Sequence, residues 1–85
     1  MQKIKQIKNN NMTNNLTEYL TVNSSMINDA WYKSETKSLI LGFNSGASYH
    51  YRNVPRDIFE SLRYAESKGS FIHTRIIGTF EFSKQ

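Results

Sequence analysis

Alternating apolar and polar residues in the middle of the chain predict a small antiparallel sheet. Residues 38–44 place an apolar side chain at every second position, which is the period of a half-buried strand. Residues 48–53 repeat this period with Tyr49 and Tyr51, and residues 26–33 are rich in side chains that suit a pleated surface. We therefore expect a three-stranded antiparallel meander.

The lengths of the two connecting turns set the expected pairing of these strands. A two-residue loop pairs Trp31 with Ile40, and a three-residue loop at residues 45–47 pairs Ile40 with Arg52. One face then points to the core with Tyr32, Leu39, Leu41, Phe43, Tyr49 and Tyr51. The opposite face carries Trp31, Ile40 and Arg52 in one row and Asp29, Gly42 and His50 in the next.

A helix is predicted after the sheet. Pro55 suits the first helical turn, where its missing N–H costs nothing. Four apolar residues then recur at helical spacing: Ile58, Phe59, Leu62 and Ala65. Gly69 is the expected C-terminal stop, residues 71–77 a short helical turn, and residues 79–82 a last short strand.

The expected fold class is therefore α+β: a three-stranded antiparallel meander packed on one main helix, with a short C-terminal helical turn or strand. Residues 1–21 form a basic, Asn-rich N-terminal segment that we expect to be flexible at least to residue 15. Residues 16–22 are more apolar and either add an edge strand or pack against the body. Residues 22–85 form the folded domain.

Composition narrows the function classes. A chain of 85 residues holds one small domain, and the absence of Cys excludes disulfide scaffolds and thiolate metal sites. No apolar run is long enough to span a bilayer, so we expect a cytoplasmic protein without membrane partners. The net charge of +4 favours an anionic partner, but half of it lies in residues 1–21.

Catalysis finds little support in the sequence. The serines lack a nucleophile motif, and the carboxylates are not paired at metal-ligand spacing. An acid–base pair of Asp29 and His50 across the sheet is the one arrangement that the spacing allows. We expect no enzyme activity, no metal and no cofactor.

The ordered residues of the domain resemble the KTSC domain family, which is named for a C-terminal segment of some lysyl-tRNA synthetases. The matching residues are Ser24, Ser25, Tyr32, Leu39, Leu41, Phe43, Ser45, Gly46, Tyr49, Tyr51, Val54, Pro55, Phe59, Leu62, Ala65, Ser67, Gly69, Phe71 and Ile76. The resemblance covers about residues 22–82 and implies a compact meander-plus-helix domain, without established catalysis and with RNA binding suggested. The family pattern has Asn and Arg where this chain has His73 and Ile77, so a ligand site built on those two residues would be altered here.

The first candidate ligand site lies on the sheet. Trp31 beside Gly42, with His50 and Arg52 nearby, resembles a platform on which a base stacks while an arginine contacts phosphate. The alternative is that the N-terminal segment or a second subunit covers this face. Tyr49 and Tyr51 are expected mostly in the core, with their hydroxyls at the rim or, alternatively, in contact with a ligand.

The second candidate site follows the helix. Lys68, His73 and Arg75 cluster in sequence around a Gly-Ser turn whose backbone N–H groups could also bind phosphate.

These features predict a non-enzymatic binding module for RNA, another nucleic acid or a nucleotide-type ligand. The first alternative is a small phage-type protein that sequesters a nucleotide-derived immune signal, since the high Asn, Lys and Ile content is compatible with an AT-rich phage genome. The second is a protein–protein interaction module that docks through the Trp31–Ile40 face. A homo-oligomer through the same face is also compatible with so small a core.

Overall fold

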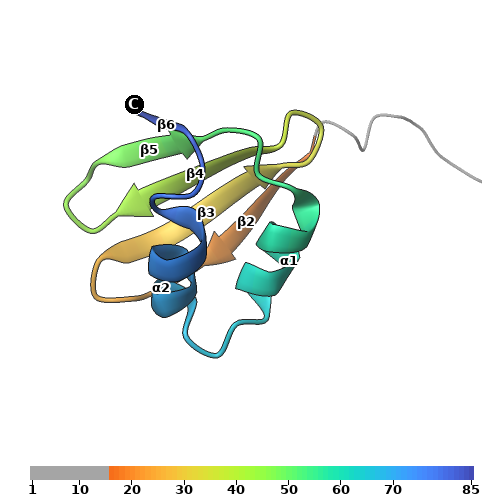
Figure 1. Cartoon of the computed structure of the whole chain (residues 1–85). Coiled ribbons are helices and arrows are strands. Elements are labelled where there is room, and N and C mark those ends of the chain that lie inside the picture. Colours follow the sequence, from red (N-terminus) through yellow and green to blue (C-terminus); the bar gives the residue numbers. More distant parts are fainter. Residues whose placement is uncertain (1–15) are drawn as a thin grey trace, which may run out of the picture.

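The computed structural model describes residues 16–85, in which a five-stranded antiparallel sheet carries two helical segments on one face (Figure 1). Neighbours in the sheet follow the chain order β2-β3-β4-β5-β6, so the whole sheet is a meander. The strands are β2 (Thr17–Thr21), β3 (Ile27–Lys33), β4 (Ser38–Phe43), β5 (Ser48–Tyr51) and β6 (Phe82–Lys84). The helical segments are α1 (Arg56–Arg63) and α2 (Lys68–Phe71), the latter continued by the π-helical turn η3 (Ile72–Ile76).

The α+β class is confirmed, but the sheet is wider than the three strands that the sequence predicts. Those three are β3, β4 and β5, and one further strand pairs at each edge. The edge-strand alternative for residues 16–22 is the one observed, so the sheet begins at Thr17, within the segment that the sequence analysis sets apart as residues 1–21. The C-terminal strand begins at Phe82 and not at residue 79. The flexibility expected for residues 1–15 lies outside the described residues.

The first predicted register is confirmed and the second is wrong by two residues. Trp31 pairs with Ile40 as expected, but Ile40 pairs with His50 and not with Arg52. The three-residue loop is Asn44-Ser45-Gly46, closed by a bond from the Phe43 N–H to the Ala47 carbonyl. Gly46 has φ +96°, which a glycine tolerates, and this places it at the last loop position. A shift of two residues keeps every side chain on its predicted face.

The core lies between the sheet and the helices. Its fully or almost fully buried members are Val22, Ile27, Ala30, Tyr32, Leu39, Leu41, Tyr51, Val54, Phe59, Leu62, Ile72 and Ile76. A register irregularity between Ile27 and Asp29 turns both Ile27 and Ala30 inward. Both helical segments therefore cover one face of the sheet, and we call the opposite face the outer face (Figure 1).

The predicted main helix ends earlier than expected. α1 stops at Arg63, and Ser67 starts α2 by accepting a hydrogen bond from the Ser70 N–H. Gly69 is thus inside α2 and is not a stop. Its role is close approach, since a Cβ at Gly69 would lie 2.9 Å from the Cβ of Ser24 in the β2–β3 loop.

Within residues 16–85, no helix combines the length and the apolar character needed to cross a membrane.

Candidate functional site

The fold separates the candidate ligand residues instead of gathering them. Trp31 and His50 point to the outer face, whereas Tyr49 and Tyr51 belong to the helix face. Lys68, His73 and Arg75 lie on α2 and η3, which also pack on the helix face. The sheet platform and the cluster after the helix are therefore on opposite sides of the sheet and cannot hold one ligand within one chain.

One row of side chains crosses the outer face from edge to edge. The strand pairings align Tyr19, Trp31, Ile40, His50 and Ser83 in this row. The rings of Tyr19 and Trp31 are in tilted contact, with centroids 5.4 Å apart. Tyr19 was not predicted to lie in this row, because no local pattern in the sequence specifies which strand residues 17–21 pair with. Arg52 lies beyond the row and donates a hydrogen bond from Nη1 to Ser83 Oγ at 3.1 Å, so its predicted place beside Ile40 is wrong.

Gly42 does not leave an open space for a flat ligand, as the platform hypothesis assumed. A methyl group there would overlap Oδ1 of Asp29 and lie 3.2 Å from Cζ3 of Trp31. The Asp29 carboxylate is also bound by the Tyr19 hydroxyl, which donates to Oδ2 at 3.1 Å. The space above Gly42 is thus filled by side chains of β3.

The acid–base pair of Asp29 and His50 does not form. The two residues lie on β3 and β5 with β4 between them, a separation of two strand spacings or about 10 Å. Nε2 of His50 is buried and has no hydrogen-bond partner among the described residues. This pair therefore provides no proton-transfer route.

The residues after α1 do not converge on one phosphate either. Lys68 donates to the carbonyl of Ala65 at 3.4 Å, and the Arg75 guanidinium lies 5.4 Å from the centroid of the Phe71 ring. The Ser70 N–H of the Gly-Ser pair is occupied by the Ser67 cap. His73 is exposed, but two residues along a helical turn correspond to nearly opposite sides, so it diverges from Arg75.

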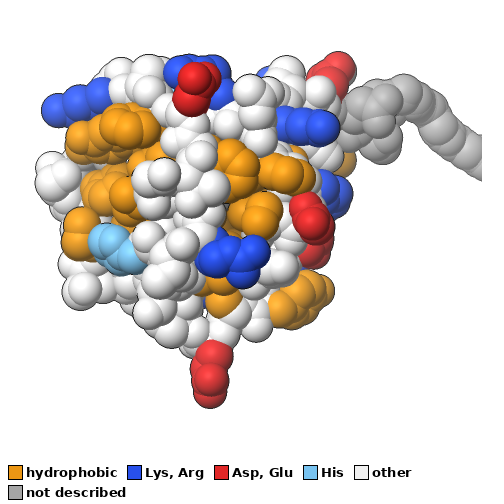
Figure 2. All heavy atoms as spheres, in the orientation of Figure 1, with side chains coloured by type: hydrophobic (Ala, Val, Ile, Leu, Met, Phe, Trp, Pro, Cys, Tyr) orange, Lys and Arg blue, Asp and Glu red, His pale blue; other side chains and the backbone are white. Residues whose placement is uncertain are grey.

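A different site emerges beside η3, where the helix face of the sheet is hollowed. An apolar groove of about 380 Å³ is lined by Met26, Phe43, Ser45, Ala47, Tyr49, Tyr51, Ile77 and Phe82. We call it the aromatic groove. Figure 2 shows hydrophobic side chains gathered at the end of this face that carries the β4–β5 hairpin.

The aromatic groove is walled by a chain of ring contacts. The Tyr49 ring meets Phe43 edge-on at a centroid distance of 5.2 Å and Phe82 in a tilted contact at 5.5 Å. Tyr51 closes the inner end, also 5.5 Å from Phe82. Burial raises the pKa of the Tyr51 hydroxyl, so this ring is a neutral part of the core. Phe82, in contrast, is 51% exposed.

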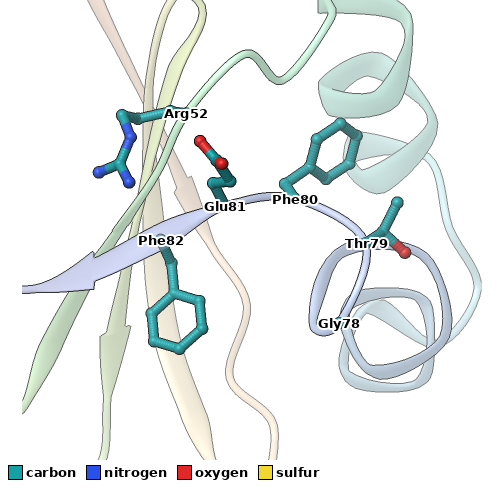
Figure 3. Close-up of a pocket in the computed structure, with 6 residues that line it drawn as sticks. All are labelled: Arg52, Gly78, Thr79, Phe80, Glu81 and Phe82. Carbon is teal, nitrogen blue, oxygen red and sulfur yellow. The ribbon is translucent and has the colours of Figure 1, made fainter.

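Two cations flank the strand that carries Phe82. Lys84 pairs with Tyr49 in the sheet register, so both side chains lie on the helix face. Arg52 lines a shallow pocket of about 520 Å³ together with Gly78 and residues 79–82. Figure 3 shows Arg52 and Phe82 on opposite sides of the β6 ribbon.

Of the residues that line this groove, Tyr49 and Tyr51 were predicted as possible ligand contacts, whereas Met26 and Phe82 were not. Phe82 lies in the predicted C-terminal strand, but the sequence does not specify which strand this last strand pairs with. Ile77 occupies a position where the family resemblance leads us to expect Arg. In this chain Ile77 gives the groove an apolar side chain at that point.

Comparisons with known proteins agree on one family. The sequence profile described as the KTSC domain matches residues 23–80. The lysine–tRNA ligase of Trichormus variabilis is 38% identical over an aligned region that covers 71% of this chain. The lysine–tRNA ligase of a Nostoc species is 40% identical over 62% of this chain. The chain spans only 11% and 9% of those two ligases. A protein from Tsukamurella paurometabola is 42% identical over 52 residues, which are 61% of this chain and 78% of that protein.

A solved structure shares the same fold. A KTSC domain protein from Yersinia pestis superposes with a TM-score of 0.76 at 28% identity. The superposition covers 82% of this chain and 99% of that one.

Proposed function

This chain belongs to the KTSC domain family, and we propose that it is a non-enzymatic module that binds an unpaired nucleobase with its phosphate. The observation that carries the proposal is the aromatic groove, where the exposed Phe82 ring and the Tyr49 ring form one wall beside Lys84. Such a ligand is either a segment of single-stranded nucleic acid or a free nucleotide.

The aromatic walls of the groove suit a stacked nucleobase. Aromatic side chains accept bases by stacking, which is worth about 1–3 kcal/mol per base and tolerates any sequence. The groove offers a half-exposed Phe82 ring and the Tyr49 hydroxyl at the same site. Pockets of about this size with mostly apolar walls and few polar groups are typical small-ligand sites.

Two cationic side chains next to the groove, Lys84 and Arg52, suit a phosphate. Lys84 lies beside Tyr49 on the helix face, and Arg52 lies on the other side of β6. Arg52 uses one N–H in its bond to Ser83 and has five in total, so donors remain for an anion. A backbone that follows the edge strand β6 would meet Arg52 and Lys84 in turn.

Two of the relatives add support for RNA as the source of the base. They are lysine–tRNA ligases, enzymes whose names state that they act on a tRNA. The part of those enzymes that matches this chain is only 11% and 9% of their length, so the aromatic groove remains the main support for the proposal.

The test is a titration of the full chain with two series of ligands, in which fluorescence anisotropy or calorimetry measures binding. One series consists of single-stranded RNA and DNA oligomers of increasing length, and the other of mononucleotides and cyclic dinucleotides. Affinity that rises with strand length identifies nucleic acid, and length-independent 1:1 binding of a small nucleotide identifies a sequestering protein. Absence of saturable binding in both series overturns the proposal.

The groove is tested by Phe82→Ala, which removes a half-exposed ring with little effect on the core. We expect affinity to fall by about 5- to 150-fold, the equivalent of one lost base stack. Tyr64→Ala is the matched control, because Tyr64 is an 80% exposed aromatic residue at the end of α1 and does not line the groove. Equal affinities for both variants would locate any binding elsewhere.

The phosphate contact is tested by Lys84→Gln. For single-stranded ligands, each phosphate contact contributes about 0.7 to the slope of log affinity against log salt. Lys84→Gln should lower the slope by about this amount. Lys37→Gln in the exposed β3–β4 turn removes the same charge and should leave the slope unchanged.

A further inference from the structure

The outer face of the sheet is covered by none of the helices and is distinct from the aromatic groove. α1, α2 and η3 all pack on the opposite face (Figure 1). Across the middle of the outer face runs the row Tyr19, Trp31, Ile40, His50 and Ser83. Tyr19 is 53% exposed in this row, although it is a large aromatic residue. A five-stranded sheet face with aromatic and aliphatic residues at its centre has the composition of an interface core.

The charges of the outer face lie on either side of that row and are opposite in sign. On β3, Asp29 precedes Trp31 by two residues and Lys33 follows it by two. Because side chains alternate along a strand, all three point to the outer face. The ion pairs formed within residues 16–85 use only Glu18, Glu60, Arg56 and Arg63. Asp29 and Lys33 thus lack an oppositely charged partner among the described residues.

Next to the edge strand β6, the positive charge of Arg52 and the negative charge of Glu81 offset each other. Arg52 and Glu81 are backbone neighbours, since the Arg52 N–H donates to the Glu81 carbonyl at 2.9 Å. The face is therefore negative at Asp29, apolar along the β2–β4 part of the central row and positive at Lys33. This pattern is complementary to itself after a half-turn about the row.

We propose that two copies of this chain pack outer face to outer face, related by a two-fold axis that runs along the central row. Rotation about that axis reverses the strand direction and leaves each strand above its own counterpart. Asp29 of one copy then lies over Lys33 of the second, and the reciprocal pair forms at the same time, as an isologous interface requires. On the axis, Trp31 meets the Trp31 of the second copy and Ile40 of the middle strand meets its own counterpart, between two aligned sheets.

This arrangement leaves the aromatic groove free, because the groove opens on the helix face. A dimer would display two grooves on its two outer sides. The groove and Lys84 therefore stay accessible in the dimer, whereas Arg52, the second cation of the binding proposal, lies on the outer face. Phe82→Ala, outside the interface, and Trp31→Ala, outside the groove, distinguish the failure of one proposal from the failure of the other.

The oligomeric state of the full chain is the first measurement, by sedimentation equilibrium and native mass spectrometry. We expect a dimer that dissociates on dilution, and that dissociates more readily at high salt because two of its contacts are ion pairs near the surface. Trp31→Ala should shift the chain to monomer. A native chain that stays monomeric at every concentration overturns the proposal.

Charge exchange tests the proposed register. Asp29→Lys and Lys33→Asp each break two symmetric pairs and place like charges together, so each should weaken dimerisation by about tenfold or more. The double variant Asp29→Lys/Lys33→Asp restores opposite charges across the interface and should recover native association. A double variant as weak as either single variant, or a dimer unaffected by all three, would overturn the proposed arrangement.

Two controls separate the interface from the fold of one chain. Tyr19→Phe removes the hydrogen bond to Asp29 without changing charge, and it should leave the dimer intact. Thermal unfolding of each charge variant, carried out under conditions that keep it monomeric, should give closely similar midpoints for the single and double variants. Dimer loss that tracks a lower melting temperature would count against the interface.

Discussion

Glu18 on the edge strand β2 and Arg56 at the start of α1 form a bidentate ion pair across 38 residues of sequence. Nη1 and Nη2 of Arg56 donate to the two carboxylate oxygens of Glu18 at 2.6 and 2.8 Å. Arg63, the last residue of α1, donates to the same carboxylate at 2.9 Å. Glu60 pairs with Arg56 at 3.0 Å and completes the network. One side chain of β2 therefore ties the edge of the sheet to both ends of α1.

Glu18→Gln should make the stability of the domain less sensitive to acid. The Arg56 hydrogen bond holds the pKa of Glu18 below its ordinary value of 4.5. A carboxyl group whose pKa is lower in the folded state stabilises the fold fully above its unfolded-state pKa and loses that effect as the pH falls through the folded-state pKa. Urea unfolding from neutral pH down to below pH 4.5 should show a shallower decline for the variant.

Glu35→Gln serves as the matched control, because Glu35 is an exposed carboxylate in the β3–β4 turn. It should reproduce the native pH profile. A Glu18→Gln profile that runs parallel to the native one would show that the ion pairs make no net contribution to folding.

Tyr32→Phe should destabilise the domain by about 1–2 kcal/mol. The Tyr32 hydroxyl is fully buried and donates to the Val54 carbonyl at 2.7 Å, so the variant leaves a buried acceptor without its partner. The ring itself stays, and its stacking on Phe59 at 4.7 Å is retained. Urea unfolding measures the loss, with Tyr64→Phe at an exposed site as the control that should change nothing.

Gly69→Ala should destabilise the domain even though alanine is the better helix former. The gain in helix propensity is at most about 1 kcal/mol. The new Cβ would lie 2.9 Å from the Cβ of Ser24, whose hydroxyl is fixed by bonds to the backbone of Ile27. Overpacking of this kind costs about 1–3 kcal/mol.

The cause of that loss is tested by a double-mutant cycle. In a Ser24→Gly background the overlap is removed, so Gly69→Ala should cost less or become favourable. An equal cost in both backgrounds would mean that the contact with Ser24 is not the reason for glycine at this position.

The local alternation of apolar and polar residues was sufficient to predict the three central strands. It also predicted the face of the sheet to which the side chains of these strands point. The alternation through Leu39, Leu41, Tyr49 and Tyr51 survives the incorrect second register, because a slip of two residues preserves the face. The same slip changed the proposed site, however, since it moved Arg52 away from Ile40 and brought His50 there.

The aromatic groove could not be predicted from the local pattern of apolar and polar residues, for a different reason. It is formed by Met26 before β3, Tyr49 on β5 and Phe82 on β6, three segments far apart in the sequence. Their meeting depends on which strand pairs with β5 at its free edge, and a three-residue strand carries too little signal to specify that.

The sequence by itself determined the α+β class, the family, the central meander and the face of that meander that packs on the core, because period and turn chemistry are local properties of the chain. Only the tertiary structure decided that the sheet has five strands, that Trp31 and the residues after α1 lie on opposite sides of it, and that Phe82 and Lys84 come to lie beside Tyr49. The physical reason is that edge-strand pairing and helix packing bring together distant residues, and their energies arise from contacts that no short stretch of sequence contains.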